Sequence, residues 1–382
     1  MSTFFLHVGT PKTGTTAIQS FLAMQENQKV LGKYGFAYPL FVKYDMSGDD
    51  AVIARNAHPL IYGEYQNIHT YDENQEMRDR FFADVKSLLD SGKNVIVSDE
   101  SVWHVCNKID SFYKNIYEKI KSYGHEMKVI VYLRRQDDFV QSYWRYKVMI
   151  PRRHLKLSFK KFIEKEKYGY FPLDYFKQIS YIADSVGGKE NVIVRVYERD
   201  QFAGSPPNII EDFFGCVGLK LTDEYVSPSL KRNPGLDVIS CEVKRRINAD
   251  PELQNNNEIR KMLIDITEEN AEQGLYKVST LFSKKDGEMF MQKYEESNKK
   301  TAEVFLGRAD GKLFYKSPEF LTEPVTKFND KDYMDIYYRL MKKLAMENER
   351  LITENNNLKT KKEKPAQKRS FMSRVKNKLK GS

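Results

Sequence analysis

Four short apolar runs, rich in β-branched residues and separated by helical patterns, constrain the fold more than any other feature of the sequence. The runs are residues 4–8, 94–97, 128–133 and 191–197. Because they lack polar alternation, they are typical of strands buried on both faces of a parallel sheet. The helical patterns between them supply the crossovers that parallel strands need. We therefore expect an α/β fold with three layers, α/β/α, around a central parallel sheet.

A loop with two glycines follows the first predicted strand and leads into a helix that starts at about Thr15. Such a loop directs backbone N–H groups to one point, and the helix dipole there favours an anion such as phosphate or sulfate. The alternative is a plain strand-to-helix turn capped by threonine. Because a lysine and paired threonines accompany the glycines, the sequence predicts a phosphate-binding loop. Its residues are Gly9, Thr10, Pro11, Lys12, Thr13, Gly14, Thr15 and Thr16.

The lysine of this loop stands at an unusual position. In nucleoside triphosphatases the pattern is GxxxxGK[ST], where lysine directly follows the second glycine. Here Thr15 follows Gly14, and Lys12 precedes Gly14 by two residues. We therefore expect Lys12 at the rim of the loop, beside the bridging atom of a bound anhydride. The loop therefore indicates a nucleotide phosphate, with a leaving chemistry different from that of nucleoside triphosphatases.

A second phosphate site is predicted at the end of the third strand. Ligands of open α/β sheets bind outside the carboxyl ends of the strands. Arg134 lies at such an end, and Ser142 follows eight residues later, about two turns into the next helix. Both side chains suit one phosphate group. The alternative is a surface arginine that pairs with a nearby aspartate.

Residues 6–17 resemble the 5′-phosphosulfate loop of sulfotransferases, which use 3′-phosphoadenosine 5′-phosphosulfate (PAPS) as donor. These enzymes share the spacing of Arg134 and Ser142, where the pair grips the donor's 3′-phosphate. The resemblance is to prokaryotic carbohydrate-type sulfotransferases above all and covers about residues 3–315. It implies a fold like that of P-loop nucleoside triphosphate hydrolases, with PAPS as co-substrate and no metal. Residues 231–233 are a weaker candidate for further contacts with the donor phosphates.

Sulfuryl transfer is an in-line displacement, for which the protein supplies position, charge neutralisation and a proton acceptor. The resemblance implies that Lys12 stabilises charge on the bridging oxygen of the leaving phosphate. Glu100, after the second strand, is the first candidate for the base, with Asp99 beside it. His58 and His104 are the alternatives. For each of them a structural hydrogen bond or a solvated charge is the competing interpretation.

Two other functions fit part of the sequence. Residues 95–100 also resemble a Walker B strand, which together with the glycine loop indicates an ATP- or GTP-dependent kinase. The missing Lys-Ser/Thr pair after Gly14 and the presence of Arg134 and Ser142 argue against it. The third hypothesis is a non-catalytic nucleotide-binding scaffold, against which the intact Lys12 argues.

The acceptor is less well indicated. The stretch from Tyr143 to His154 combines aromatic and cationic residues. Such a lining suits a saccharide or glycan that offers a hydroxyl or an amine. The alternative is that the aromatic residues belong to the core and the cations to a solvated face.

We expect the chain to divide into a domain over residues 1–320, which the resemblance implies is the sulfotransferase domain, a coiled coil over 331–359 and a basic tail over 360–382. Leucine recurs at heptad position d, and asparagine stands at two a positions, which favours a parallel two-stranded coiled coil and hence a homodimer. The alternative is a single solvated helix. The d positions are Tyr337, Leu344, Leu351 and Leu358, and the two a positions are Asn348 and Asn355.

The formal net charge of +9 is concentrated in residues 359–382, which contain ten basic residues and one acidic residue. Because the remaining chain is neutral, we expect no nucleic-acid partner. Apolar residues at helical spacing within 370–380 predict attachment to an anionic membrane surface, the alternative being a disordered solubilising tail. Three separated cysteines indicate a reducing compartment. We therefore expect a cytoplasmic protein, peripheral at the inner face of the cell membrane.

Overall fold

The computed structural model describes residues 1–40, 54–61, 71–105, 109, 111–150, 154–227, 235–276, 280–320 and 329–379, without the side chains of 71–74, 105 and 359–379. The chain forms two compact units. The first contains Met1–Trp144, Phe159–Asn233 and Ser279–Pro324, and the second contains Arg145–Ser158, Pro234–Val278 and Val325–Ser382.

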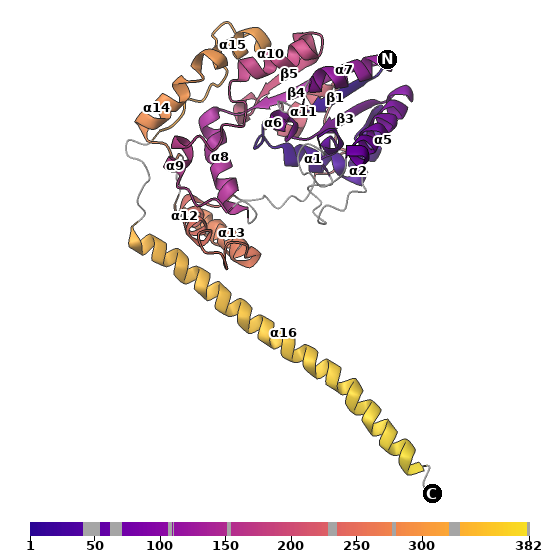
Figure 1. Ribbon diagram of the computed structural model, residues 1–382, viewed down its shortest axis with the longest axis vertical. Coiled ribbons are helices and arrows are strands. Elements are labelled where there is room, and N and C mark those ends of the chain that lie inside the picture. Colours follow the sequence, from indigo (N-terminus) through magenta and orange to yellow (C-terminus); the bar gives the residue numbers. More distant parts are fainter. Residues whose placement is uncertain are drawn as a thin grey trace. The chain divides into compact units, whose positions relative to one another are not determined.

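A parallel sheet lies at the centre of the first unit (Figure 1). Its strands are β1 (Thr3–His7), β2 (Phe36–Ala37), β3 (Asn94–Ser98), β4 (Glu126–Leu133) and β5 (Val192–Val196), in the order β2-β3-β1-β4-β5. Every strand pair is parallel. The predicted α/β class and the parallel sheet are therefore confirmed, and the four predicted strands are present. The two-residue strand β2 was not predicted.

Helices cover both faces of this sheet. Side chains alternate between the two faces along a strand, and those of Phe5, Ile96 and Ile130 pack into one apolar cluster with α1 (Thr15–Ala23), α2 (Gln25–Lys33) and α11 (Ile209–Val217). Other helices contact the strands outside this cluster: α5 (Tyr71–Asp90) contacts β3, α7 (Phe112–Ser122) contacts β4, and α10 (Tyr175–Ser185) contacts β5. The arrangement agrees with a three-layer fold.

The described part of the first unit contains further helices. They are α6 (Val102–Val105), α9 (Phe159–Glu164), α14 (Lys284–Gln292), α15 (Glu295–Leu306) and the 3₁₀ turns η1 (His58–Leu60), η3 (Lys189–Asn191) and η4 (Arg199–Gln201). Helix α8 (Gln136–Met149) begins in the first unit, and its last residues belong to the second.

The second unit is built from α12 (Val238–Ile247), α13 (Asn257–Glu272) and the long helix α16 (Asp330–Leu379). Near its start α16 buries Ile336 and Leu340 and packs against α12 and α13. Arg339 adds an ion pair with Glu269 at 2.6 Å. The sequence pattern did not predict that α12 and α13 pack against the C-terminal helix.

Most of the predicted coiled-coil seam is not in this buried face. Leu344, Leu351 and Leu358 are exposed, and no partner chain is described. The coiled coil therefore stays a prediction. The helix continues through Pro365 into the basic tail. The membrane-binding prediction for 360–382 rests on side chains outside the described part of the chain and also stays a prediction.

None of the helices in the described ranges combines the length and the apolar character that crossing a membrane requires.

Candidate functional site

The candidate site lies at the carboxyl edge of the sheet, where β1, β3 and β4 end side by side. His7, the last residue of β1, pairs with Ser98 of β3 and with Ile130 of β4. The loop that follows β1 stays attached to β4, because the Thr10 N–H donates to the Tyr132 carbonyl at 2.9 Å. The glycine loop, the segment that begins with Asp99 and the segment that begins with Arg134 therefore leave the sheet together.

The glycine loop turns sharply, and its backbone explains both glycines. Gly9 has φ of +29° and Gly14 has φ of +75°, values that a residue with a side chain rarely adopts. A Cβ at Gly9 would lie 2.9 Å from Cγ2 of Thr15. Lys12 has φ of +73° without being glycine. An outlier of this kind is often found where function needs it, and here it marks the predicted reactive lysine.

Helix α1 begins directly after the loop with unpaired N–H groups. Its N-cap, Gly14, provides no side-chain cap. The N–H groups of Ala17 and Ile18 donate to the Gly14 carbonyl, whereas no acceptor for those of Thr15 and Thr16 is present in the described ranges. Free N–H groups and the positive end of the helix dipole make this turn suitable for an anion.

Lys12, Arg134 and Glu100 form one electrostatic group beside this turn. Arg134 Nη1 donates to the Lys12 carbonyl at 2.8 Å, and the guanidinium lies 5.7 Å from the centre of the Tyr197 ring. Burial lowers the pKa of the Lys12 ammonium, the charge of Arg134 lowers it further, and the Glu100 carboxylate acts in the opposite direction. Three residues predicted from separate strand ends are thus close enough to influence one another.

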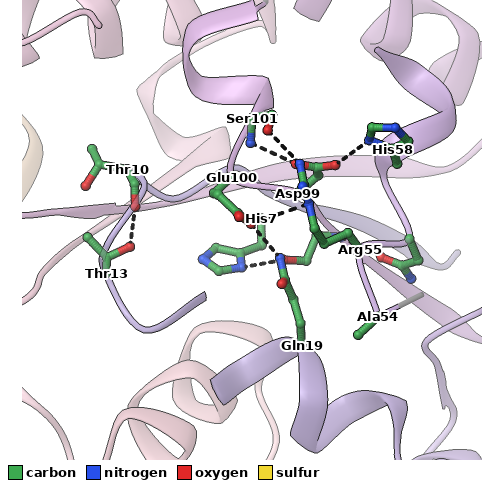
Figure 2. Close-up of polar contacts among 12 residues, drawn as sticks. His7, Thr10, Thr13, Gln19, Ala54, Arg55, His58, Asp99, Glu100 and Ser101 are labelled. Atoms are coloured by element: carbon green, nitrogen blue, oxygen red, sulfur yellow. Dashed lines mark hydrogen bonds and ion pairs between the residues drawn. The ribbon is translucent and has the colours of Figure 1, made fainter. Parts of the chain in front are cut away.

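Asp99 forms the buried centre of a second polar group (Figure 2). Its Oδ2 faces His58 Nδ1 at 3.1 Å, and its Oδ1 accepts from Arg55 and from the Ser101 N–H. Burial alone would raise the pKa of Asp99, but the charge of Arg55 and the hydrogen bond from His58 hold it well below its usual range. Asp99 is fully buried, so it is placed to orient His58 and Arg55 and not to meet a substrate.

Glu100 points away from Asp99 and remains accessible. Its side chain is 22% exposed, against 13% for His58. Glu100 Oε2 accepts from Gln19 Nε2 at 3.0 Å and lies 3.8 Å from Arg55 Nε. Both candidate bases therefore remain, each held by a different partner.

A buried histidine lies underneath the loop. His7 packs against Phe213 and Tyr132, with ring centroids 5.2 and 5.8 Å apart. Burial lowers the pKa of His7 to about 3, so the ring is neutral at physiological pH. Its Nδ1 is 2.9 Å from Ser98 Oγ.

Other predicted residues lie apart from this group or outside the described chain. Ser142, on α8, is half-buried, and no hydrogen bond joins it to Arg134 or the loop among the described residues. His104 packs on the rings of Phe171 and Tyr170 at 4.8 and 5.7 Å. Residues 231–233 lie outside the described residues.

The predicted acceptor lining is in part core. Tyr143 and Trp144 are buried, as the core alternative expects, whereas Tyr146 is exposed. Residues 151–153 are outside the described chain.

Sequence reasoning missed four residues of the site: His7, Gln19, Arg55 and Tyr197. Arg55 and Tyr197 carried no distinguishing pattern. Gln19 is buried on α1 among apolar neighbours, and His7 interrupts an apolar strand. A polar residue at a position that the periodicity assigns to the interior is the one signal that could have identified these two.

Comparisons with known proteins do not show a family for this chain. An uncharacterized protein of Archaeoglobus fulgidus is 29% identical over 218 residues, which is 56% of this chain. The matched region spans about half (54%) of that relative's length. No protein-family model matches the chain, and no solved structure matches it.

The neutral state of His7 makes stability depend on pH. The unfolded chain binds a proton at His7 below pH 6.5, whereas the folded protein does so only near pH 3. The stability that neutral His7 contributes is therefore fully present above pH 6.5 and is lost as the pH falls from 6.5 toward 3. Relative to His7→Gln, the wild-type unfolding free energy should fall by about 1.4 kcal/mol per pH unit in this window. Urea denaturation at several pH values measures it, and parallel curves for the two proteins would contradict a buried neutral histidine.

Proposed function

We propose that the protein is a PAPS-dependent sulfotransferase of the P-loop-like α/β type, which transfers the sulfuryl group to a hydroxyl or amine of a saccharide or glycan. The observation that carries the proposal is the electrostatic group of Lys12, Arg134 and Glu100 beside the uncapped start of α1. Two cations and free N–H groups suit a donor with several negative charges, and a carboxylate suits the proton of the acceptor. The acceptor class follows from the resemblance alone.

The chemical step breaks one bond and forms one. The acceptor oxygen or nitrogen attacks sulfur, the bond between sulfur and the bridging oxygen breaks, and adenosine 3′,5′-bisphosphate leaves. Lys12 stabilises the negative charge that develops on the bridging oxygen, and the N–H groups of Thr15 and Thr16 hold the 5′-phosphate. The acceptor's proton passes to Glu100. Positioning and preorganised charge supply the rate enhancement.

Asp99 argues against the kinase alternative. In that hypothesis residues 95–100 are a Walker B strand, whose aspartate helps to hold the magnesium ion. Both oxygens of Asp99 are already occupied, by Arg55 and the Ser101 N–H on one side and by His58 on the other. A carboxylate neutralised by these partners is poorly placed to hold a metal ion.

Glu100 is the better candidate for the base. Its charge acts on Lys12, the residue to which the proposal gives the charge-stabilising role, and this supports Glu100 as the base. His58 is oriented by Asp99, an arrangement that favours an imidazole base, and it remains the alternative.

Replacement of Lys12 tests the proposed function. Lys12→Ala should lower transfer from ³⁵S-labelled PAPS by about 100- to 1000-fold, because a charge-stabilising group is lost. The fold should stay intact, as circular dichroism would show. Lys33→Ala is the matched control, since Lys33 is an exposed lysine on α2. A Lys12→Ala enzyme with the wild-type rate would overturn the role given to Lys12.

The base can be identified by single-turnover kinetics with saturating PAPS and an acceptor found by screening saccharides. Glu100→Gln should lower the rate by about 100-fold or more, since proton transfer in the transition state is lost. His58→Gln should change it less. Binding of adenosine 3′,5′-bisphosphate should be retained in both variants. The reverse order of the two rates would assign the base to His58.

We also propose that α16 joins two copies of the chain as a parallel coiled coil. Beyond the buried Leu340, the heptad residues Leu344, Leu351 and Leu358 are 36%, 49% and 52% exposed. An isolated helix that exposes such a stripe gains nothing from it, whereas pairing buries it. Asparagine at two a positions favours an identical partner in parallel register.

Sedimentation equilibrium tests this pairing. The wild-type chain should sediment as a dimer, and Leu351→Asp should sediment as a monomer because a charge enters the seam. Met346→Asp is the control, since Met346 is 61% exposed and lies at heptad position f, outside the seam. A monomeric wild-type protein, or a Leu351→Asp dimer, would refute the coiled coil.

A further inference from the structure

We infer that Gln19 is a positioning residue, which fixes Glu100 relative to the donor-binding turn and is itself held by Ser98 and His7. The inference rests on the proposed function for the role of Glu100. The hydrogen-bond network itself does not depend on the proposed function, because it exists independently of any reaction.

Gln19 donates both protons of its amide NH₂ group. Nε2 donates to Glu100 Oε2 at 3.0 Å and to Ser98 Oγ at 3.1 Å. An amide NH₂ has two protons, so both are engaged. The side chain is 1% exposed, and a buried donor with both partners in place has little freedom to move.

The hydroxyl of Ser98 connects Gln19 to His7 through a second hydrogen bond. Among the described contacts of Ser98 Oγ, Gln19 Nε2 is a donor, and His7 Nδ1, 2.9 Å away, is the atom that can accept the hydroxyl proton. Nδ1 is then an acceptor, and the proton of the neutral ring is on Nε2. Figure 2 shows His7, Gln19 and Glu100 close together at this edge of the sheet.

Helix α1 connects this network to the donor-binding turn. Gln19 is four residues after Thr15, which is about one turn of the helix. The helix therefore presents the free N–H group of Thr15 in its first turn and the donor to Glu100 one turn later. A single rigid element thus sets the distance between the bound phosphate and the base.

The partners of Glu100 leave one oxygen available. Gln19 and Arg55 both lie at Oε2. Glu100 Oε1 has no hydrogen-bond partner within the described ranges, and the side chain is 22% exposed. The geometry therefore assigns Oε1 as the atom that receives the acceptor's proton, with Oε2 as the anchored atom.

Gln19→Met tests the inference, because methionine has a similar length and donates no hydrogen bond. The single-turnover rate should fall by roughly 10- to 100-fold, the usual effect of losing a positioning partner. The affinity for adenosine 3′,5′-bisphosphate, measured by calorimetry, should stay within about twofold, since the loop and Arg134 are untouched. Ser20→Ala, the next residue on α1, is the matched control and should retain the wild-type rate.

Imidazole ¹⁵N NMR provides a readout that needs no activity. Wild-type His7 should give the neutral form protonated at Nε2, with the resonances assigned by their absence in His7→Gln. In Gln19→Met the Ser98 hydroxyl no longer accepts a proton from Gln19, so the Nδ1-protonated form should become populated.

An unchanged His7 spectrum in Gln19→Met would overturn the network, and an unchanged rate would overturn the positioning role. If wild-type protein transfers no sulfuryl group while the His7 spectrum changes as expected, the proposed function falls and the network stands.

Discussion

The parallel pairing of β1 between β3 and β4 is the constraint on which the site depends. Because His7 is in register with Ser98 on one side and Ile130 on the other, three segments leave the sheet at the same edge. One carries the glycine loop, one carries Asp99 and Glu100, and one carries Arg134. A shift of this register would separate Lys12 and Arg134 from Glu100, and the three residues could then not act on one substrate.

Burial then divides the charges at this edge into two groups. Asp99 is enclosed with Arg55 and His58, and its charge is neutralised within the protein. Burial lets the charges of Arg134 and Glu100 act strongly on Lys12, one lowering and the other raising its pKa. The positive charge that the donor would meet therefore comes from Lys12, Arg134 and the start of α1. The net charge of the whole chain is a separate property, because it is concentrated in residues 359–382.

The sequence predicted the sheet because a continuous β-branched run has few other uses, and it predicted Lys12, Glu100 and Arg134 together because each follows a strand. It did not predict which side chains contact these residues. Whether Asp99 or Glu100 turns inward depends on the chain direction after β3, which periodicity does not encode. Arg55 comes from a segment without a regular pattern. The packing of α12 and α13 on α16 joins residues far apart in sequence, and an amphipathic pattern does not say which faces meet.

The central claim is that this edge binds a nucleotide with a 3′-phosphate and needs no metal to do so. Thermal unfolding with adenosine 3′,5′-bisphosphate in the presence of EDTA tests it most directly, with magnesium and ATP as the comparison. The account predicts a rise in the melting temperature with adenosine 3′,5′-bisphosphate and EDTA, and loss of that rise in Arg134→Ala. Stabilisation by magnesium and ATP alone would contradict it.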